Sequence, residues 1–175
     1  GLGAIGKAVA EKLRALDVEV YACDPFVAQE DAAKLGVTLV DMETLFSECD
    51  IISNHLANKP ELKNIFNRKL FKLMKKHSTF INTGRGAQVA EFQLALSLFA
   101  HPSITVVADV IKNETFPYAS PLFWCRNAIL TPHIAGSTGN EPQRMAYYMM
   151  DELDRYLSFQ SVKYEVTQDM LERMA

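Results

Sequence analysis

The chain has 175 residues, of which 49% are hydrophobic and 22% are charged, so it is long enough to bury a core and unlike a fibrous or disordered protein. Its formal net charge of −3 argues against a nucleic-acid partner, and no apolar run reaches the roughly 18 residues that a membrane span needs. The three cysteines, Cys23, Cys49 and Cys125, lack the spacing of a metal site, so we expect no bound metal. Their odd number also indicates reduced thiols, as in a cytoplasmic protein.

The first third of the chain is predicted to begin with a helix and to continue with strands. Apolar residues recur at helical spacing over residues 4–16, and a β-type run follows at 18–23. Two more strands are predicted at 37–40 and 50–53, and a short helix that begins near Asp41 separates them.

Helices and strands keep alternating in the remainder of the chain. The predicted elements are a helix at 67–74, a strand at 79–82, a helix at 89–100, strands at 105–108 and 128–130, and a final helix at 140–157 with an apolar face. Such alternation predicts an α/β fold, a doubly wound parallel sheet covered by helices on both faces. Residues 113–127, rich in proline and aromatic residues, are expected to form a long surface loop, and such loops often carry function.

A glycine motif stands at the start of the first predicted helix. Gly1, Gly3 and Gly6 form a G-x-G-x-x-G sequence, in which glycines allow a tight turn and let backbone N–H groups approach a pyrophosphate. Alone this signal is weak, but Asp24 follows the next strand, 18 residues after Gly6, where a carboxylate accepts hydrogen bonds from an adenosine ribose. Together they predict a Rossmann-type site, and the Asp24 charge favours NAD over NADP. The alternative is that the glycines only make a turn and Asp24 caps the next segment.

The predicted dinucleotide-binding domain spans residues 1–157. The doubly wound pattern places its first, central strand before the glycine motif. Since no strand precedes Gly1 in the sequence, we expect the first strand of the fold to be missing from the chain.

Three further segments come where predicted strands end, which is where open α/β sheets bind ligands. They are Ile81-Asn82-Thr83-Gly84-Arg85-Gly86, then Ala108-Asp109-Val110 with Glu114 five residues after the aspartate, then Thr131-Pro132-His133. Their order and residues resemble the NTxRG, DV and TPH segments of the D-isomer-specific 2-hydroxyacid dehydrogenases, over essentially the whole chain. The resemblance implies an NAD-dependent oxidoreductase acting on the CH–OH group of a D-2-hydroxy acid, or in reverse on a 2-oxo acid.

The resemblance also implies three catalytic residues. Arg85 binds the substrate carboxylate and carbonyl, His133 is the general acid or base, and Glu114 orients and charges His133. These residue types suit the reaction, because an imidazolium can protonate a carbonyl oxygen that gains charge and a guanidinium matches a carboxylate bidentately. Taken singly, His133 would be a structural histidine, Glu114 a solvated charge and Arg85 a turn residue, so the prediction depends on their combined order.

The expected cofactor-binding residues are Gly1, Gly3, Ala4, Ile5, Gly6, Asp24, Thr83 and Asp109. The resemblance assigns Asp109 to the nicotinamide carboxamide, and the alternative is that Asp109 satisfies backbone N–H groups at its strand end. His55 falls near the position of the family's HxP segment, but the match is poor and His55 is excluded from the catalytic set. Thr115 and Ala90 also depart from the family pattern, although neither position carries a reacting group.

In the family, a domain built largely from the N-terminal third closes over the NAD domain. We expect that domain to be absent here, residues 158–175 to return toward it, and the chain alone to bind NAD weakly and turn over negligibly. A homodimer is expected from the family. An alternative function is a non-catalytic, NAD-sensing dimeric scaffold of the corepressor type, and among enzymes a formate dehydrogenase would carry Gln in place of Glu114. The particular 2-hydroxy acid is left open.

Overall fold

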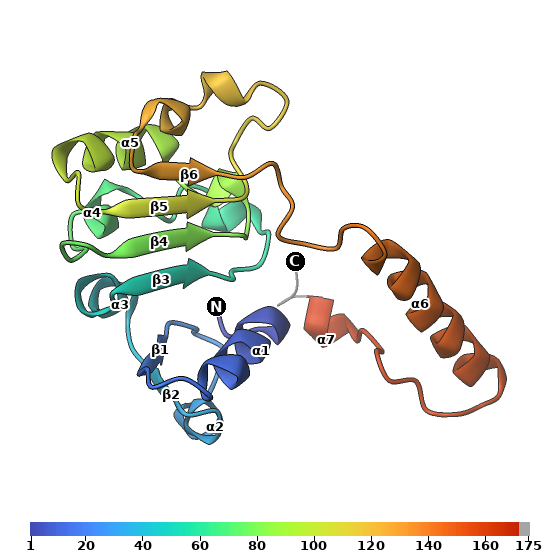
Figure 1. Cartoon of the computed structure of the whole chain (residues 1–175). Helices are drawn as coiled ribbons and strands as arrows, with labels where there is room; N and C mark the ends of the chain where they lie inside the picture. Colours follow the sequence, from blue (N-terminus) through green and yellow to red (C-terminus); the bar gives the residue numbers. More distant parts are fainter. Residues whose placement is uncertain (172–175) are drawn as a thin grey trace.

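The computed structural model describes residues 1–171 and confirms the predicted α/β class. Its larger sheet contains β3 (Ile51–Asn54), β4 (Thr79–Asn82), β5 (Thr105–Ala108) and β6 (Ala128–Leu130), in that order and all parallel (Figure 1). The register pairs Asn54 with Asn82 and Asn82 with Ala108, so these strands end together. The loops that follow them therefore meet at one edge of the sheet.

A separate two-stranded parallel sheet contains β1 (Val20–Ala22) and β2 (Val37–Leu39). No strand pairing within the described residues joins it to the larger sheet, so the single sheet that was predicted is present as two sheets. The N-terminus lies between β3 and α1 (Ala4–Leu13) (Figure 1). That a first strand belongs before Gly1 stays a prediction.

The predicted helices are present with shifted ends. α3 (Met42–Glu48) begins where the Asp41 side chain accepts a hydrogen bond from the Thr44 N–H at 2.6 Å, and α5 (Glu91–Ala100) starts two residues later than expected. α4 (Arg68–Phe71) is only one turn long, because the Leu73 N–H bonds three residues back to Leu70 and tightens the backbone.

Several short elements were not predicted from the sequence. α2 (Gln29–Lys34) has one buried residue, Ala32, and therefore no apolar period that reveals a helix. The 3-10 helices of the described chain are η1 (Pro60–Leu62), η2 (Gly86–Gln88), η3 (Pro117–Ala119) and η4 (Pro121–Trp124). The last two lie in the predicted loop at 113–127, which is consequently more ordered than expected.

The main core lies against the larger sheet and is rich in phenylalanine. Phe46, Phe66, Phe71 and Phe80 are each at most 3% exposed, and the centroids of rings in contact lie 5.2–6.0 Å apart. Burying one such side chain stabilises a fold by about 1.5–3 kcal/mol, so this cluster fixes α3 and α4 against β4. A smaller core joins α1 and α2 to the two-stranded sheet and consists of Leu2, Ala10, Ala22, Ala32 and Val37.

The final predicted helix is present as α6 (Glu141–Leu157), which extends away from both sheets (Figure 1). None of its residues is buried, and its expected apolar face is exposed at Met145, Tyr148, Met149, Leu153 and Tyr156. The chain continues to α7 (Gln168–Leu171). Residues 172–175 of the predicted C-terminal segment 158–175 lie outside the described residues, and the boundary after residue 157 stays a prediction.

Candidate active site

The glycine motif forms the turn that leads into α1. A Cβ atom on Gly1 would lie 2.7 Å from the backbone oxygen of His55, and one on Gly6 would overlap the carbonyl of Gly1. By contrast, no heavy atom lies within 4 Å of the place where Gly3 would carry a Cβ. Gly3 is the N-cap of the ten-residue helix α1, so this helix begins beside the open position without an N-cap side chain to accept from its first N–H groups. Such a helix N-terminus favours an anionic ligand.

Asp24 lies directly beside this turn. Its Oδ2 accepts a hydrogen bond from the backbone N–H of Leu2 at 2.7 Å, and its Oδ1 accepts one from the N–H of Phe26 at 2.9 Å. The bond from Phe26 is the local cap that the alternative interpretation expected. The bond from Leu2 ties the carboxylate to the glycine turn, so the structure brings the motif and the acidic residue together.

His55 sits beside the same turn. Its Nε2 lies 2.9 Å from the Oγ of Ser53. Burial lowers the pKa of the His55 ring, so the neutral imidazole is favoured.

The segments expected to carry the chemistry follow the neighbouring strands β4, β5 and β6. The backbone N–H of Asp109 donates to the carbonyl of Asn82 at 2.9 Å, and the N–H of His133 donates to the carbonyl of Asp109 at 3.0 Å. These bonds continue the lateral pairing beyond the strand ends. They hold the loops that carry Arg85 and His133 at the same edge of the sheet.

Glu114 and His133 are in direct contact although 19 residues separate them in the chain. The Oε2 atom of Glu114 lies 2.9 Å from Nδ1 of His133, and the two side chains are 47% and 48% exposed. Because Nδ1 faces the carboxylate, Nε2 is the ring nitrogen that does not take part in this contact. His133 also has a φ of 54°, in the left-handed region that residues other than glycine rarely adopt.

Asp109 stabilises this unusual turn. Its carboxylate is buried and accepts hydrogen bonds from the hydroxyl of Thr131 and from the N–H groups of Ile134 and Ala135, the latter two at 2.9 Å. Burial opposes ionisation of Asp109, but these hydrogen bonds outweigh it and lower the pKa of the carboxyl group. Asp109 therefore satisfies backbone N–H groups near its strand end, as the alternative interpretation expected. Contact between Asp109 and a nicotinamide stays a prediction.

Arg85 lies exposed on the loop between β4 and η2, and its Nη1 donates to the carbonyl of Gly84 at 2.8 Å. A Cβ on Gly84 would lie 2.5 Å from Nδ2 of Asn54, and one on Gly86 would overlap the backbone of Ile111. Glycine is thus required where this loop presses against the last residue of β3 and the segment that follows β5. The packing leaves Arg85 exposed at this edge of the sheet.

A buried network of amides beneath Arg85 was not anticipated. Nδ2 of Asn54 donates to Oδ1 of Asn82 at 2.8 Å and to Oε1 of Gln88 at 2.7 Å. The Arg85 N–H also donates to Gln88 Oε1 at 3.2 Å, and Gln88 Nε2 donates to the carbonyl of Ala57 at 2.7 Å. The three amide residues are at most 3% exposed. Polar residues at the ends of apolar strands were the available signal for this network.

The predicted site residues thus form two groups, one at the glycine turn with Asp24 and one at the ends of β4, β5 and β6. Ala4, Ile5 and Thr83 are exposed. In the described part of the chain, no three metal-ligating side chains cluster together. Among the same residues, no helix combines the length and apolarity that crossing a bilayer demands.

Residues 1–135 match the family model of the D-isomer specific 2-hydroxyacid dehydrogenase, NAD binding domain. Two curated relatives are D-3-phosphoglycerate dehydrogenases. The protein from Archaeoglobus fulgidus is 36% identical over 138 residues, and the one from Synechocystis sp. is 35% identical over 153 residues. These matches cover 79% and 87% of this chain but 26% and 27% of the relatives, so the chain spans about a quarter of their length.

Solved structures show the same fold. The D-isomer specific 2-hydroxyacid dehydrogenase from Lactobacillus delbrueckii ssp. bulgaricus in its NAD-complexed form matches with a TM-score of 0.80 and 26% identity, over 95% of this chain and 54% of that one. D-lactate dehydrogenase with NAD+ from Lactobacillus jensenii matches with a TM-score of 0.78 and 26% identity, over 96% of this chain and 54% of that one.

Proposed function

Since the chain belongs to the D-isomer specific 2-hydroxyacid dehydrogenase family, as its NAD-binding domain, we propose that the protein transfers a hydride between NAD and a D-2-hydroxy acid. The observation that carries the proposal is the contact between Glu114 and His133, 2.9 Å long, beside the loop of Arg85. An imidazole with a carboxylate on one ring nitrogen is a general acid and base with a defined orientation.

The glycine turn and Asp24 fit the cofactor. The open space at Gly3 and the start of α1 suit a pyrophosphate, whereas side chains at Gly1 and Gly6 would collide with backbone. Each Asp24 oxygen accepts one hydrogen bond in the structure, and a carboxylate has about four acceptor positions, so capacity remains for ribose hydroxyls. When bound, the cofactor supplies the hydride donor or acceptor.

The remaining steps belong to the chain's own side chains. In our proposal, Arg85 binds the carboxylate of the substrate through its planar guanidinium. His133 donates a proton from Nε2 to the carbonyl oxygen of a 2-oxo acid, and in the oxidative direction it accepts the hydroxyl proton at the same atom. Glu114 holds the ring through Nδ1, which keeps Nε2 pointed at the substrate.

The proposed substrate class is the 2-hydroxy acids and 2-oxo acids with a free carboxylate. The relatives named above act, by their names, on D-3-phosphoglycerate and D-lactate, so these two acids and their 2-oxo forms are the first candidates. The comparisons give no support to the alternative of a non-catalytic scaffold. We also propose that the protein is cytoplasmic and that it forms a homodimer. Light scattering during size-exclusion chromatography tests the homodimer directly, because it measures the molar mass.

Cofactor binding is tested by titrating the chain with NADH and NADPH and following nucleotide fluorescence. Saturable binding that prefers NADH and weakens in Asp24→Ala supports the proposal, whereas a folded chain that binds neither nucleotide overturns it. The reaction is tested in the protein at full length by NADH oxidation with pyruvate and 3-phosphohydroxypyruvate, beside His133→Gln and Arg85→Gln. Undiminished turnover in His133→Gln would exclude the assigned acid and base.

A further inference from the structure

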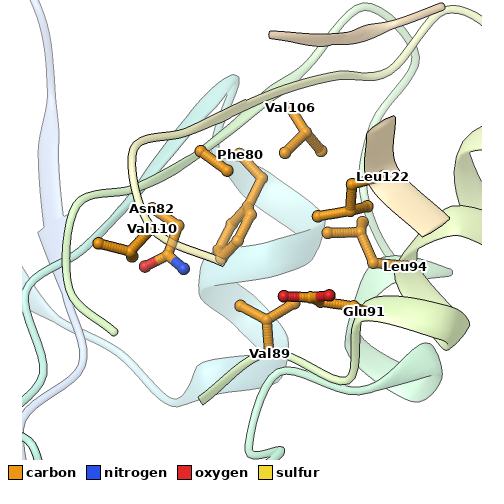
Figure 2. Close-up of a pocket in the computed structure, with 9 residues that line it drawn as sticks. Phe80, Asn82, Val89, Glu91, Leu94, Val106, Val110 and Leu122 are labelled. Carbon is orange, nitrogen blue, oxygen red and sulfur yellow. The ribbon is translucent and has the colours of Figure 1, made fainter. Parts of the chain in front are cut away.

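Glu91 is a buried acidic side chain that the proposed reaction does not use. It is the first residue of α5 and only 5% exposed. Figure 2 shows its carboxylate at a small pocket that is otherwise lined mainly by apolar side chains, among them Val89, Leu94 and Leu122. No ion pair of Glu91 occurs in the described part of the chain. A charge in such a place is costly unless hydrogen bonds compensate for its lost hydration.

The two oxygens of Glu91 are occupied by one loop. Oε1 accepts a hydrogen bond from the backbone N–H of Lys112, and Oε2 accepts one from the hydroxyl of Ser120 at 2.9 Å. Lys112 and Ser120 lie on either side of Glu114 in the chain. The buried carboxylate therefore ties down both ends of the loop that carries Glu114.

The surroundings make this anchor stiff. Gly86, on the loop of Arg85, packs so tightly on the backbone of Ile111 that a Cβ would overlap it. The N-terminal position of Glu91 in a ten-residue helix also favours its negative charge, because the helix dipole is positive there. Charge-assisted hydrogen bonds of this kind are stronger than neutral ones.

We propose that Glu91 is a positioning residue, which holds the Glu114 loop at the distance that lets Glu114 contact Nδ1 of His133. The proposal rests on the proposed function, because it assigns Glu91 to the alignment of the same acid and base. Glu91 does not touch the substrate in this proposal. It acts through Lys112 and Ser120, and removing it frees the loop on which Glu114 stands.

Chemistry distinguishes the possible replacements. Glutamine retains one acceptor oxygen for the Lys112 N–H, and its amide N–H can donate to the Ser120 hydroxyl, which then reverses its role. Alanine leaves both donors without a partner. Ser120→Ala removes one of the two contacts from the other side, together with the hydrogen bond that the Leu122 N–H donates to the Ser120 hydroxyl at 3.3 Å. The order of disturbance is therefore expected to be Glu91→Ala first, then Ser120→Ala, then Glu91→Gln.

The test is nitrogen NMR of the His133 ring in the isotope-labelled chain, because ring nitrogen resonances report which atom carries a proton and what it contacts. The His133 ring nitrogen shifts of the wild type define the state paired with Glu114, and those of Glu114→Ala define the unpaired state. The shifts of Glu91→Ala are expected to lie close to the unpaired values, and those of Glu91→Gln close to the paired values. The Lys112 amide should exchange at least about tenfold faster in Glu91→Ala, while NADH affinity stays within about twofold.

Gln93→Ala is the matched control, since Gln93 lies on α5 and accepts one backbone hydrogen bond from Arg68, far in sequence from the loop. It should leave the His133 resonances unchanged. Wild-type His133 resonances in a folded Glu91→Ala chain would overturn the proposal. If Glu91→Ala does not fold, unchanged resonances in Ser120→Ala overturn it instead. Identical resonances in wild type and Glu114→Ala would refute the pair itself and hence this role for Glu91. Absent NADH binding or turnover in the wild type tells only against the proposed function.

Discussion

Replacing Gln88 by methionine tests the buried amide network below Arg85. Methionine has a similar size but no hydrogen-bonding oxygen or nitrogen. The substitution removes the acceptor that serves one Asn54 N–H at 2.7 Å and the Arg85 N–H at 3.2 Å, and the donor to the Ala57 carbonyl at 2.7 Å. Asn54 keeps its bond to Asn82 at 2.8 Å and the bond that its Oδ1 accepts from the Leu56 N–H at 3.0 Å, so two of its three contacts survive.

The size of the stability loss depends on how deeply the groups that lose their hydrogen-bond partner are buried. A buried polar group without a partner costs about 1–3 kcal/mol, and the groups at Arg85 and Ala57 are only partly buried, so water offsets some of their loss. We expect Gln88→Met to lower the free energy of unfolding by about 2–4 kcal/mol in total. For a chain of this length, that corresponds to a Tm lowered by about 4–16 °C.

Urea unfolding followed by circular dichroism measures this loss. Gln93→Met is the control, because Gln93 is exposed and its side chain accepts one hydrogen bond, from the Arg68 N–H at 2.8 Å. The control should remain within about 0.5 kcal/mol of the wild type, as surface substitutions generally do. If Gln88→Met also unfolds within about 0.5 kcal/mol of the wild type, the network does not stabilise the fold and the reasoning is wrong.

Three further predictions follow from single contacts. Asp24→Ala should raise the Kd of NADH by about tenfold or more in a fluorescence titration, because a charge-assisted hydrogen bond contributes about 1.5–3 kcal/mol, and an unchanged Kd would exclude Asp24 from the cofactor site. Gly86→Ala should destabilise the chain by more than about 1 kcal/mol in urea unfolding, because its Cβ meets the Ile111 backbone, and a neutral result would contradict the tight packing. The pKa of Asp109 is lowered in the folded state, so its carboxylate stabilises the fold above the ordinary aspartate pKa of about 3.9, and this contribution disappears as the pH falls through the lowered value. The free energy of unfolding of Asp109→Asn should therefore lack this part of the loss that the wild type shows at acid pH. Identical profiles of stability against pH for variant and wild type would contradict the assigned contribution of Asp109.

Local pattern was enough to predict much of this protein. The strands at Thr79–Asn82, Thr105–Ala108 and Ala128–Leu130 occur as expected, because short apolar runs bounded by turn residues are typical of buried strands. The glycine turn and Asp24 were also foreseeable, since a fixed spacing places a carboxylate at the next strand end. The family resemblance was carried by the order of short segments rather than by any one residue.

Contacts between distant segments required the tertiary structure. The family resemblance predicted that Glu114 orients His133, but taken singly Glu114 would be a solvated loop charge. The folding of the loop after β5 against the end of β6 brings the two side chains together. The hydrogen bonds that the N–H groups of Ile134 and Ala135 donate to the Asp109 carboxylate span more than twenty residues, and no periodicity signals them.

Sequence by itself determined the α/β class, the dinucleotide motif and the identity of the candidate reactive side chains, because these depend on local spacing and residue chemistry. The tertiary structure decided that the strands form two sheets, that α6 lies exposed, and that Gln88 and Glu91 are buried anchors beneath the site. The sequence gives the type of a polar residue but does not show whether its side chain is buried or solvated. Only packing shows whether water or another part of the chain satisfies its hydrogen bonds.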